Sequence, residues 1–210
     1  KELPYIQEQC KKYLDDKKVE GFLFNYYHFF GDYKHYHKAH GWYKKEIRII
    51  RNDPEIHSWR SAQSFRRIPN FDGLNYRQKE GTYKLKVVPI KAHIFHYGWV
   101  RPPYLMKKKM KAFSVIHRGK AKTEERFDDL NFDYGPLHKL NKYKGTHPKV
   151  MKEWMQKFNW ADELNYSGSY PTTRRRLKHE KRKNKIISWI ENNILGGKTI
   201  GGSKNYIRVK

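Results

Sequence analysis

The amino-acid sequence predicts an α/β fold that is followed by a mainly helical, basic C-terminal extension. An amphipathic segment at residues 3–16 leads, after a short turn, into a nearly unbroken apolar and aromatic run at 21–30. A helix, a short turn and then a buried strand is the order of elements in an α/β unit. Further strand-like runs follow at 46–51 and 84–95, and beyond residue 103 the pattern becomes helical and basic.

The N-terminal helix is expected because apolar side chains recur at helical spacing, at Leu3, Ile6, Cys10, Tyr13 and Leu14. A proline near its start suits the first turn, where a missing N–H is tolerated. The run at 21–30, GFLFNYYHFF, is too short to span a membrane. Because it is almost continuously apolar, it predicts a strand that is buried on both faces.

Loops and strands alternate through the middle of the chain. Residues 31–43 and 69–82 are expected to form loops. Residues 46–51 predict a strand that ends at Asn52-Asp53-Pro54, a combination typical of turns. The run KLKVVPIKAHIF at 84–95 predicts a further strand, bent at its proline.

The C-terminal half is expected to contain helices that irregular segments separate. One helix is expected at 104–116, after a proline pair, and another near 148–158. Residues 166–173 have the Ser/Gly/Pro/Thr composition of a hinge. The charge run at 174–185 then leads into a helix at 186–194 that stops before two glycines.

The composition is that of a folded protein with a very polar exterior. Apolar residues make up 37% of the 210 residues, but aromatic residues supply 16%, and their large side chains can fill a core. There are 46 Lys and Arg against 21 Asp and Glu, which gives a net charge of +25. Such an excess selects nucleic acid, an anionic membrane or phosphate-bearing substrates as partners. The single cysteine, Cys10, excludes an internal disulfide and makes the cytosol the expected compartment.

The motif HIFHYGWVRPP at 93–103 contains a candidate ligand histidine. Because residues 93 and 96 face opposite sides of a regular strand, His93 and His96 are not expected to share a site. His96 lies at the expected carboxyl end of the strand, where ligand sites are common, and it could bind a divalent metal. The alternative is a histidine that is hydrogen-bonded among aromatic neighbours, and the spacing leaves both possibilities open.

Two further segments contain candidate substrate ligands. Arg48 and Arg51 face opposite ways on a regular strand, and either could bind phosphate oxygens or lie in solvent. The segment IHSWRSAQSFRR at 56–67 combines aromatic, amide and guanidinium groups, as sugar-binding pockets do, or it is an ordinary polar loop. The basic run at 174–185 could contact an anionic membrane, nucleic acid or only solvent.

The order of the motifs GFLFNYYHFFG, GWYKKEIRIIRND, IHSWRSAQSFR and HIFHYGWVRPP resembles a bacterial branch of the family-two glycosyltransferases. The segment WIENNILGGKTIGGSKNYIRVK is similar to the C-terminal end of that branch. The resemblance implies a GT-A-type fold, a Rossmann-like sandwich with a mixed sheet. Residues 1–103 would form its acceptor-side half, and residues 104–210 would form the helical, basic extension.

The same resemblance implies an activity and its cofactor. Such enzymes transfer a sugar with inversion from a nucleotide-sugar donor to an acceptor hydroxyl, here a glycan or a lipid-linked acceptor at the cytoplasmic face of the membrane. Mg²⁺ or Mn²⁺ holds the donor diphosphate, and His96 matches a histidine that completes the metal's ligand shell. The acidic metal-binding motif is expected just before Lys1, so residues 1–210 alone are expected to be inactive.

The resemblance also assigns substrate roles to individual residues. Residues 57–67 match the stretch that normally supplies the catalytic base, but Ser61 stands where an acid is expected, so the base stays unassigned. Trp59, Tyr97 and Trp99 are expected to stack on a sugar. Binding of substrate is further expected from Gln63, Arg66, Arg48 and Arg51.

The alternative function is a non-enzymatic nucleic-acid-binding protein that uses charge and aromatic side chains. It predicts aromatic residues interleaved with arginines on an exposed sheet. The contiguous aromatic run at 21–30 suits a buried strand instead, which favours the transferase. A third alternative, a non-catalytic glycan-binding protein, follows from the missing base.

Overall fold

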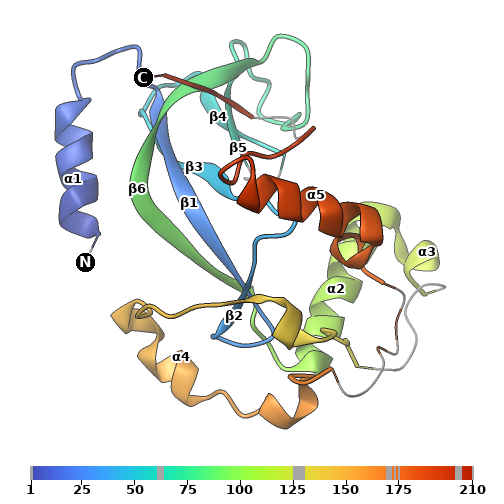
Figure 1. The fold of residues 1–210 in the computed structure, drawn as a ribbon. Coiled ribbons are helices and arrows are strands. Elements are labelled where there is room, and N and C mark those ends of the chain that lie inside the picture. Colours follow the sequence, from blue (N-terminus) through green and yellow to red (C-terminus); the bar gives the residue numbers. More distant parts are fainter. Residues whose placement is uncertain are drawn as a thin grey trace. The chain divides into compact units, whose positions relative to one another are not determined.

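The computed structural model describes residues 2–60, 64–124, 131–168, 172, 174, 176–201 and 205–209. In these residues the chain is mixed α/β, with five α-helices and eight strands in one mixed sheet (Figure 1). The strand order is β4-β5-β6-β1-β2-β7, with β3 paired to β1 and β8 paired to β6. Contacts divide the chain into unit 1, residues 1–26, 43–94 and 197–210, and unit 2, residues 27–42 and 95–196.

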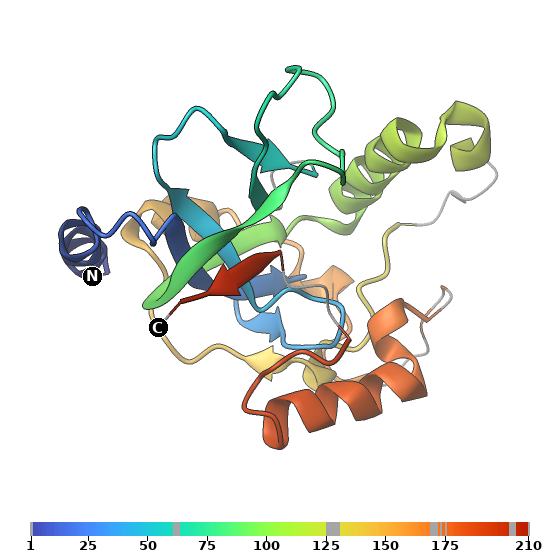
Figure 2. The same ribbon diagram turned by 90° about the horizontal axis from the view of Figure 1, so that it is seen from above.

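Unit 1 combines one helix with the larger part of the sheet. Its elements are α1 (Leu3–Lys12), β3 (Lys45–Ile50), β4 (Ile56–Trp59), β5 (Ser64–Arg67), β8 (Tyr206–Arg208) and the first parts of β1 (Gly21–Phe30) and β6 (Tyr83–Trp99). β1 pairs antiparallel with β3, from Gly21 opposite Ile50 to Asn25 opposite Lys45. β8 runs parallel to β6, which makes the sheet mixed (Figure 2).

The core of unit 1 consists of two hydrophobic clusters. Successive side chains of a strand point to opposite faces, so Phe22 and Phe24 of β1 join one cluster and Leu23 joins the other. The helix α1 packs on the first cluster through Tyr5, Ile6 and Cys10, and Tyr13, which follows the helix, packs on it as well. The predicted burial of the strand at 21–30 on both faces is thereby confirmed in this unit.

Unit 2 combines short strands, α-helices and 3₁₀ turns. Its elements are β2 (His35–His37), β7 (Asn141–Lys142), α2 (Pro103–Arg118), α3 (Lys120–Glu124), α4 (Lys152–Gln156), α5 (Arg182–Asn193), the 3₁₀ turns η1 (Leu137–Lys139), η2 (Lys149–Met151), η3 (Ala161–Glu163) and η4 (Lys178–Glu180), and the last parts of β1 and β6. Phe29 and Phe30 of β1 lie in its core with Met106 of α2 and Leu137 of η1. Large aromatic side chains therefore fill this core, as the composition predicts.

Several elements differ from the sequence prediction. The segments expected as a loop at 31–43 and as a polar stretch at 56–67 contain the strands β2, β4 and β5. The helix expected near 148–158 is shorter, a 3₁₀ turn followed by α4, and the last helix begins earlier, at Arg182. The two units follow another division than the predicted one at 103/104, because unit 1 includes residues 197–210 and unit 2 includes residues 27–42 and 95–103; the predicted division stays a prediction. Within the described ranges, every helix is too short or too polar to cross a membrane.

Candidate functional site

His96 lies in the last part of β6, and its ring faces His28 of β1. The two Nδ1 atoms are 3.1 Å apart, and the ring centroids are 5.1 Å apart. At this distance one of the two Nδ1 atoms is protonated and donates a hydrogen bond to the other. A metal bound by His96 would therefore use Nε2. His93 has a different partner, since its Nδ1 lies 2.8 Å from Oε1 of Glu2 in unit 1.

Gly98 makes room for the ring of His96. A Cβ atom at position 98 would stand 2.7 Å from Nε2 of His96 and 3.4 Å from Nζ of Lys109. Lys109 donates to the carbonyl of Gly98, and burial lowers the pKa of its ammonium, with a further contribution from Arg101. Among the described residues no group of three or more His, Cys, Asp or Glu could hold a metal ion. The metal role of His96 therefore stays a prediction.

Arg48 belongs to a buried polar cluster of unit 1. Its guanidinium lies 5.1 Å from the ring centroid of Tyr26 and donates to the carbonyl of Ile47 at 2.8 Å. The neighbouring Glu46 is only 6% exposed, and its buried Oε2 accepts no hydrogen bond from the described residues. Burial raises the pKa of Glu46 to about 7, although the positive charge of Arg48 acts in the opposite direction. The sequence analysis did not select Glu46, since nothing in the motif distinguishes it from a surface acid.

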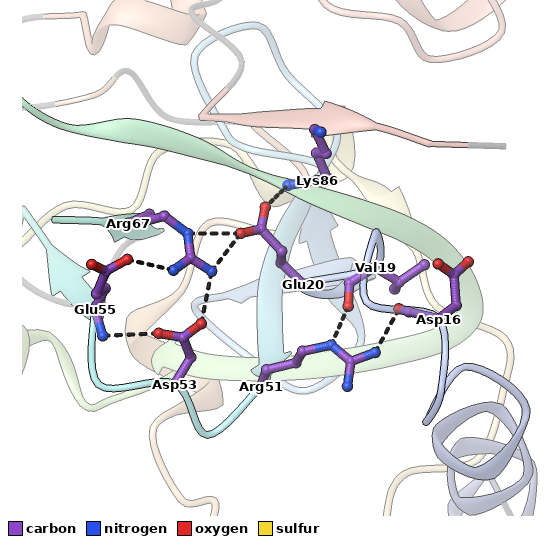
Figure 3. A network of polar contacts seen from close by, with 8 residues as sticks. All are labelled: Asp16, Val19, Glu20, Arg51, Asp53, Glu55, Arg67 and Lys86. Atoms are coloured by element: carbon purple, nitrogen blue, oxygen red, sulfur yellow. Dashed lines mark hydrogen bonds and ion pairs between the residues drawn. The ribbon is translucent and has the colours of Figure 1, made fainter. Parts of the chain in front are cut away.

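Arg51 binds the segment that joins α1 to β1 (Figure 3). Its Nε donates to the carbonyl of Val19 at 2.6 Å, and its terminal nitrogens donate to those of Tyr13, Leu14 and Asp16 at 2.8, 2.9 and 2.6 Å. These bonds occupy most of the five N–H groups of a guanidinium. Arg51 therefore has a structural role in unit 1, and its role as a phosphate ligand stays a prediction.

A second guanidinium in Figure 3, that of Arg67, lies among three carboxylates. Its nitrogens lie 2.9, 2.8 and 2.7 Å from oxygens of Glu20, Asp53 and Glu55. The other oxygen of Glu20 accepts the backbone N–H of Lys86 at 2.7 Å. The hydrogen bond from Arg67 is the main cause of the lowered pKa of Asp53. These acids are thereby committed to an ion-pair network.

Trp59 is buried under two cations. Its indole lies 4.3 Å from the guanidinium carbon of Arg60 and 4.5 Å from that of Arg66, and its Nε1 donates to the carbonyl of Gln78 at 2.8 Å. With 5% exposure, the ring offers little surface to a sugar. The buried Nε of Arg66 has no hydrogen-bond partner among the described residues, and burial lowers the pKa of this group.

Ser61 and Gln63, the other candidates of this segment, lie outside the described residues. Tyr97 and Trp99 lie in the aromatic core of unit 2. The ring of Tyr97 stacks on Phe29 at 4.9 Å, and its hydroxyl lies 2.7 Å from Nδ1 of His147. Trp99 packs edge-on against Trp42 with ring centroids 5.5 Å apart. Both rings are half-buried, and their stacking on a sugar stays a prediction.

A cavity of about 1010 Å³ lies within unit 2. Its cationic lining residues are Lys38, Lys139, Arg176, Arg182 and Lys185. Among the described residues that line it, the carboxylate is Glu180, which binds Arg174 at 2.7 and 3.1 Å. Three of its cations, all of them exposed, come from the basic run at 174–185. The sequence alone does not reveal the cavity, because β2, η1 and the consecutive elements η4 and α5 are three segments far apart in the chain.

His37 lines the same cavity from β2 and is 2% exposed. Its ring stacks on Trp42 and lies edge-on to His179, with centroid distances of 4.3 Å in both cases. Neither ring nitrogen has a hydrogen-bond partner among the described residues. Burial holds the pKa of His37 well below its ordinary value, and the nearby His179 and His28 lower it further. The cavity thus combines exposed cations with a buried neutral imidazole.

Comparison with protein-family models, curated proteins and solved structures gives no match.

Proposed function

We propose that this chain is part of an inverting glycosyltransferase with a GT-A-type fold, which transfers a sugar from a nucleotide-sugar donor to an acceptor hydroxyl of a cell-surface glycan precursor. The order of the motifs suggests this activity, and the mixed α/β architecture with a buried β1 is compatible with it. The observation that carries the proposal is the placement of His96, which lies in β6 opposite His28 with its Nε2 over Gly98.

In this proposal two of the candidate residues have a defined task. His96 would bind a divalent metal through Nε2, and the metal would neutralise the leaving diphosphate. Arg66 is the best-supported substrate ligand among the described residues, because its buried Nε needs an acceptor that a substrate oxygen can supply. The catalytic base is not assigned, since the position that matches it is occupied by Ser61.

The test is sugar transfer from common nucleotide sugars by the protein expressed from its complete gene, with and without Mn²⁺. We expect metal-dependent transfer, and we expect His96→Ala to weaken the dependence on Mn²⁺. His117→Ala is a suitable control because His117 is exposed on α2. An unchanged metal titration in His96→Ala would remove His96 from the ligand shell.

The same preparation distinguishes the transferase from a nucleic-acid-binding protein. The aromatic side chains Phe22, Phe24, Phe29 and Phe30 of β1 are at most 5% exposed, so they cannot stack on bases in the folded protein. This burial supports the transferase. Absence of transfer from every donor, together with salt-sensitive RNA binding, would refute it.

A further inference from the structure

We propose that the cavity of unit 2 binds a small molecule that carries a phosphate or diphosphate group on a ring. This inference goes beyond the proposed transferase activity and does not depend on it. It rests on the charge of the cavity, on its size and on the imidazole of His37, which has no hydrogen-bond partner in the part of the chain that the structure describes.

The charge of the cavity selects an anion. Among the described residues, five cationic side chains line it against one carboxylate, that of Glu180. Glu180 is already neutralised by Arg174. In the part of the chain that the structure describes, Arg176, Arg182 and Lys185 have no carboxylate partner within ion-pair distance. Guanidinium and ammonium groups in this arrangement bind phosphate oxygens with charge-assisted hydrogen bonds.

The size and the inner surface of the cavity favour a ligand that is larger than an inorganic ion. A volume of about 1010 Å³ is that of a site for a whole small molecule. The cations are exposed, whereas Phe30, His37 and Tyr134 are buried and form the inner lining. A ligand whose phosphate meets the cations can therefore place a ring against the aromatic side chains.

His37 supplies the hydrogen-bonding group inside the cavity. A buried polar atom without a partner is rare in folded proteins and indicates that a partner is supplied by water or a ligand. Its ring is held by the stack on Trp42 and by the edge contact with His179. Because a neutral imidazole has one donor and one acceptor nitrogen, it can pair with a phosphate oxygen or a ligand hydroxyl.

The test is calorimetric titration of residues 1–210 with inorganic pyrophosphate at constant ionic strength. We expect saturable binding at one site, weakened about tenfold or more in the double variant Arg182→Gln/Lys185→Gln. The matched control is Lys111→Gln/Lys122→Gln, which removes the same charge from exposed positions of α2 and α3 outside the cavity. We expect the control to bind as tightly as the original protein.

A second variant separates a specific site from general charge attraction. His37→Phe keeps an aromatic ring on Trp42 but has no ring nitrogen, so it should fold and bind glucose 1-phosphate several-fold more weakly. Equal losses in the cavity and control variants, or no saturable binding of either probe, would overturn the proposal.

The phosphate could come from a soluble molecule or from a lipid headgroup. Titration with glucose 1-phosphate tests the soluble source, and vesicles of phosphatidylcholine with added polyprenyl phosphate test the lipid source. Binding in either arm that Arg182→Gln/Lys185→Gln abolishes supports the site and identifies the source. Binding of RNA that pyrophosphate does not displace, without binding of either phosphate probe, would contradict it.

Discussion

The imidazole of His37 stacks on the indole of Trp42, with ring centroids 4.3 Å apart and planes inclined by only 10°. His179 of η4 approaches the same imidazole from another side, and His28 faces it from the neighbouring strand β1. Glu180, Arg174 and Lys185 are the charged groups that act on His179. Burial therefore lowers the pKa of His37, and the nearby His179 and His28 lower it further; burial also lowers the pKa of His179.

The first prediction is a loss of stability as the pH falls below about 6.5. The folded state lowers the pKa of His37, His147 and His179, chiefly through burial. At pH values between the lowered pKa of the folded state and the pKa of the unfolded state, the unfolded chain binds protons that the native chain does not bind. The free energy of unfolding therefore decreases as the pH falls through this interval. Each histidine contributes at most about 1.4 kcal/mol per pH unit in that range. Urea denaturation at several pH values between 7.5 and 5 measures the effect.

The variant His37→Phe should reduce this acid sensitivity, because a phenyl ring cannot be protonated. His117→Gln is the control, since His117 is exposed. An identical pH profile in His37→Phe and His117→Gln would show that His37 is not a source of the effect.

The second prediction concerns Glu46, whose effect has the opposite sign. Its folded-state pKa of about 7 exceeds the ordinary value of 4.5. Between pH 4.5 and pH 7 the native protein therefore holds a proton that the unfolded chain releases. The contribution of Glu46 to stability is therefore present below about pH 4.5 and is lost as the pH rises through 7. Glu46→Gln, a neutral side chain of the same shape, should be more stable than the original protein at pH 8, by about 1–3 kcal/mol, and nearly equal at pH 4.5.

Glu8→Gln is the control for this experiment, because Glu8 is exposed on α1. Thermal denaturation of both variants at pH 4.5 and pH 8 gives the comparison. A stability difference for Glu46→Gln that does not change with pH would contradict the proposed protonation of Glu46.

The elements that the sequence predicts best are those with a strong local pattern. The continuous apolar run predicts β1, and the regular spacing of apolar residues predicts the start of α1 and nearly both bounds of α2, although α1 ends at Lys12 and not at residue 16. The strands β2, β7 and β8 have two or three residues each, too few for a period to emerge. The pairing of β7 and β8 depends on partners far away in the chain, as β7 depends on β2 and β8 depends on β6.

The candidate sites show the same limit. Sequence patterns identified the arginines, but not that Arg51 would bind backbone carbonyls or that two guanidiniums would cover Trp59. The burial of His37 is created by Trp42 and by His179, which lies far away in the sequence. The excess of lysine and arginine left nucleic acid, an anionic membrane and phosphate-bearing substrates open as partners, whereas only the tertiary structure brings three distant segments together around one cavity.

The third prediction concerns the ion-pair network of Arg67. Arg67→Gln removes the partner of three carboxylates and leaves them close together, so we expect a loss of about 2 kcal/mol at pH 7. The lowered pKa of Asp53 adds stability above its unfolded pKa of 3.8, and this contribution disappears as the pH falls through the folded value. The cost of Arg67→Gln should therefore shrink at pH 3. Arg77→Gln, in an exposed loop, is the control, and equal costs for the two variants in urea denaturation would refute the prediction.

The fourth prediction is that Gly98 and His96 are energetically coupled. Gly98 does not have a positive φ, so its backbone accepts alanine, and the nearest obstacle is the ring of His96, 2.7 Å from the new Cβ. Gly98→Ala should displace this ring from His28 and cost about 1–2 kcal/mol, a typical penalty for an overpacked site. In His96→Ala the obstacle is gone, so the same substitution should then cost nearly nothing. A double-mutant cycle in urea measures the difference, and additive costs would show that the glycine serves some purpose other than accommodating His96.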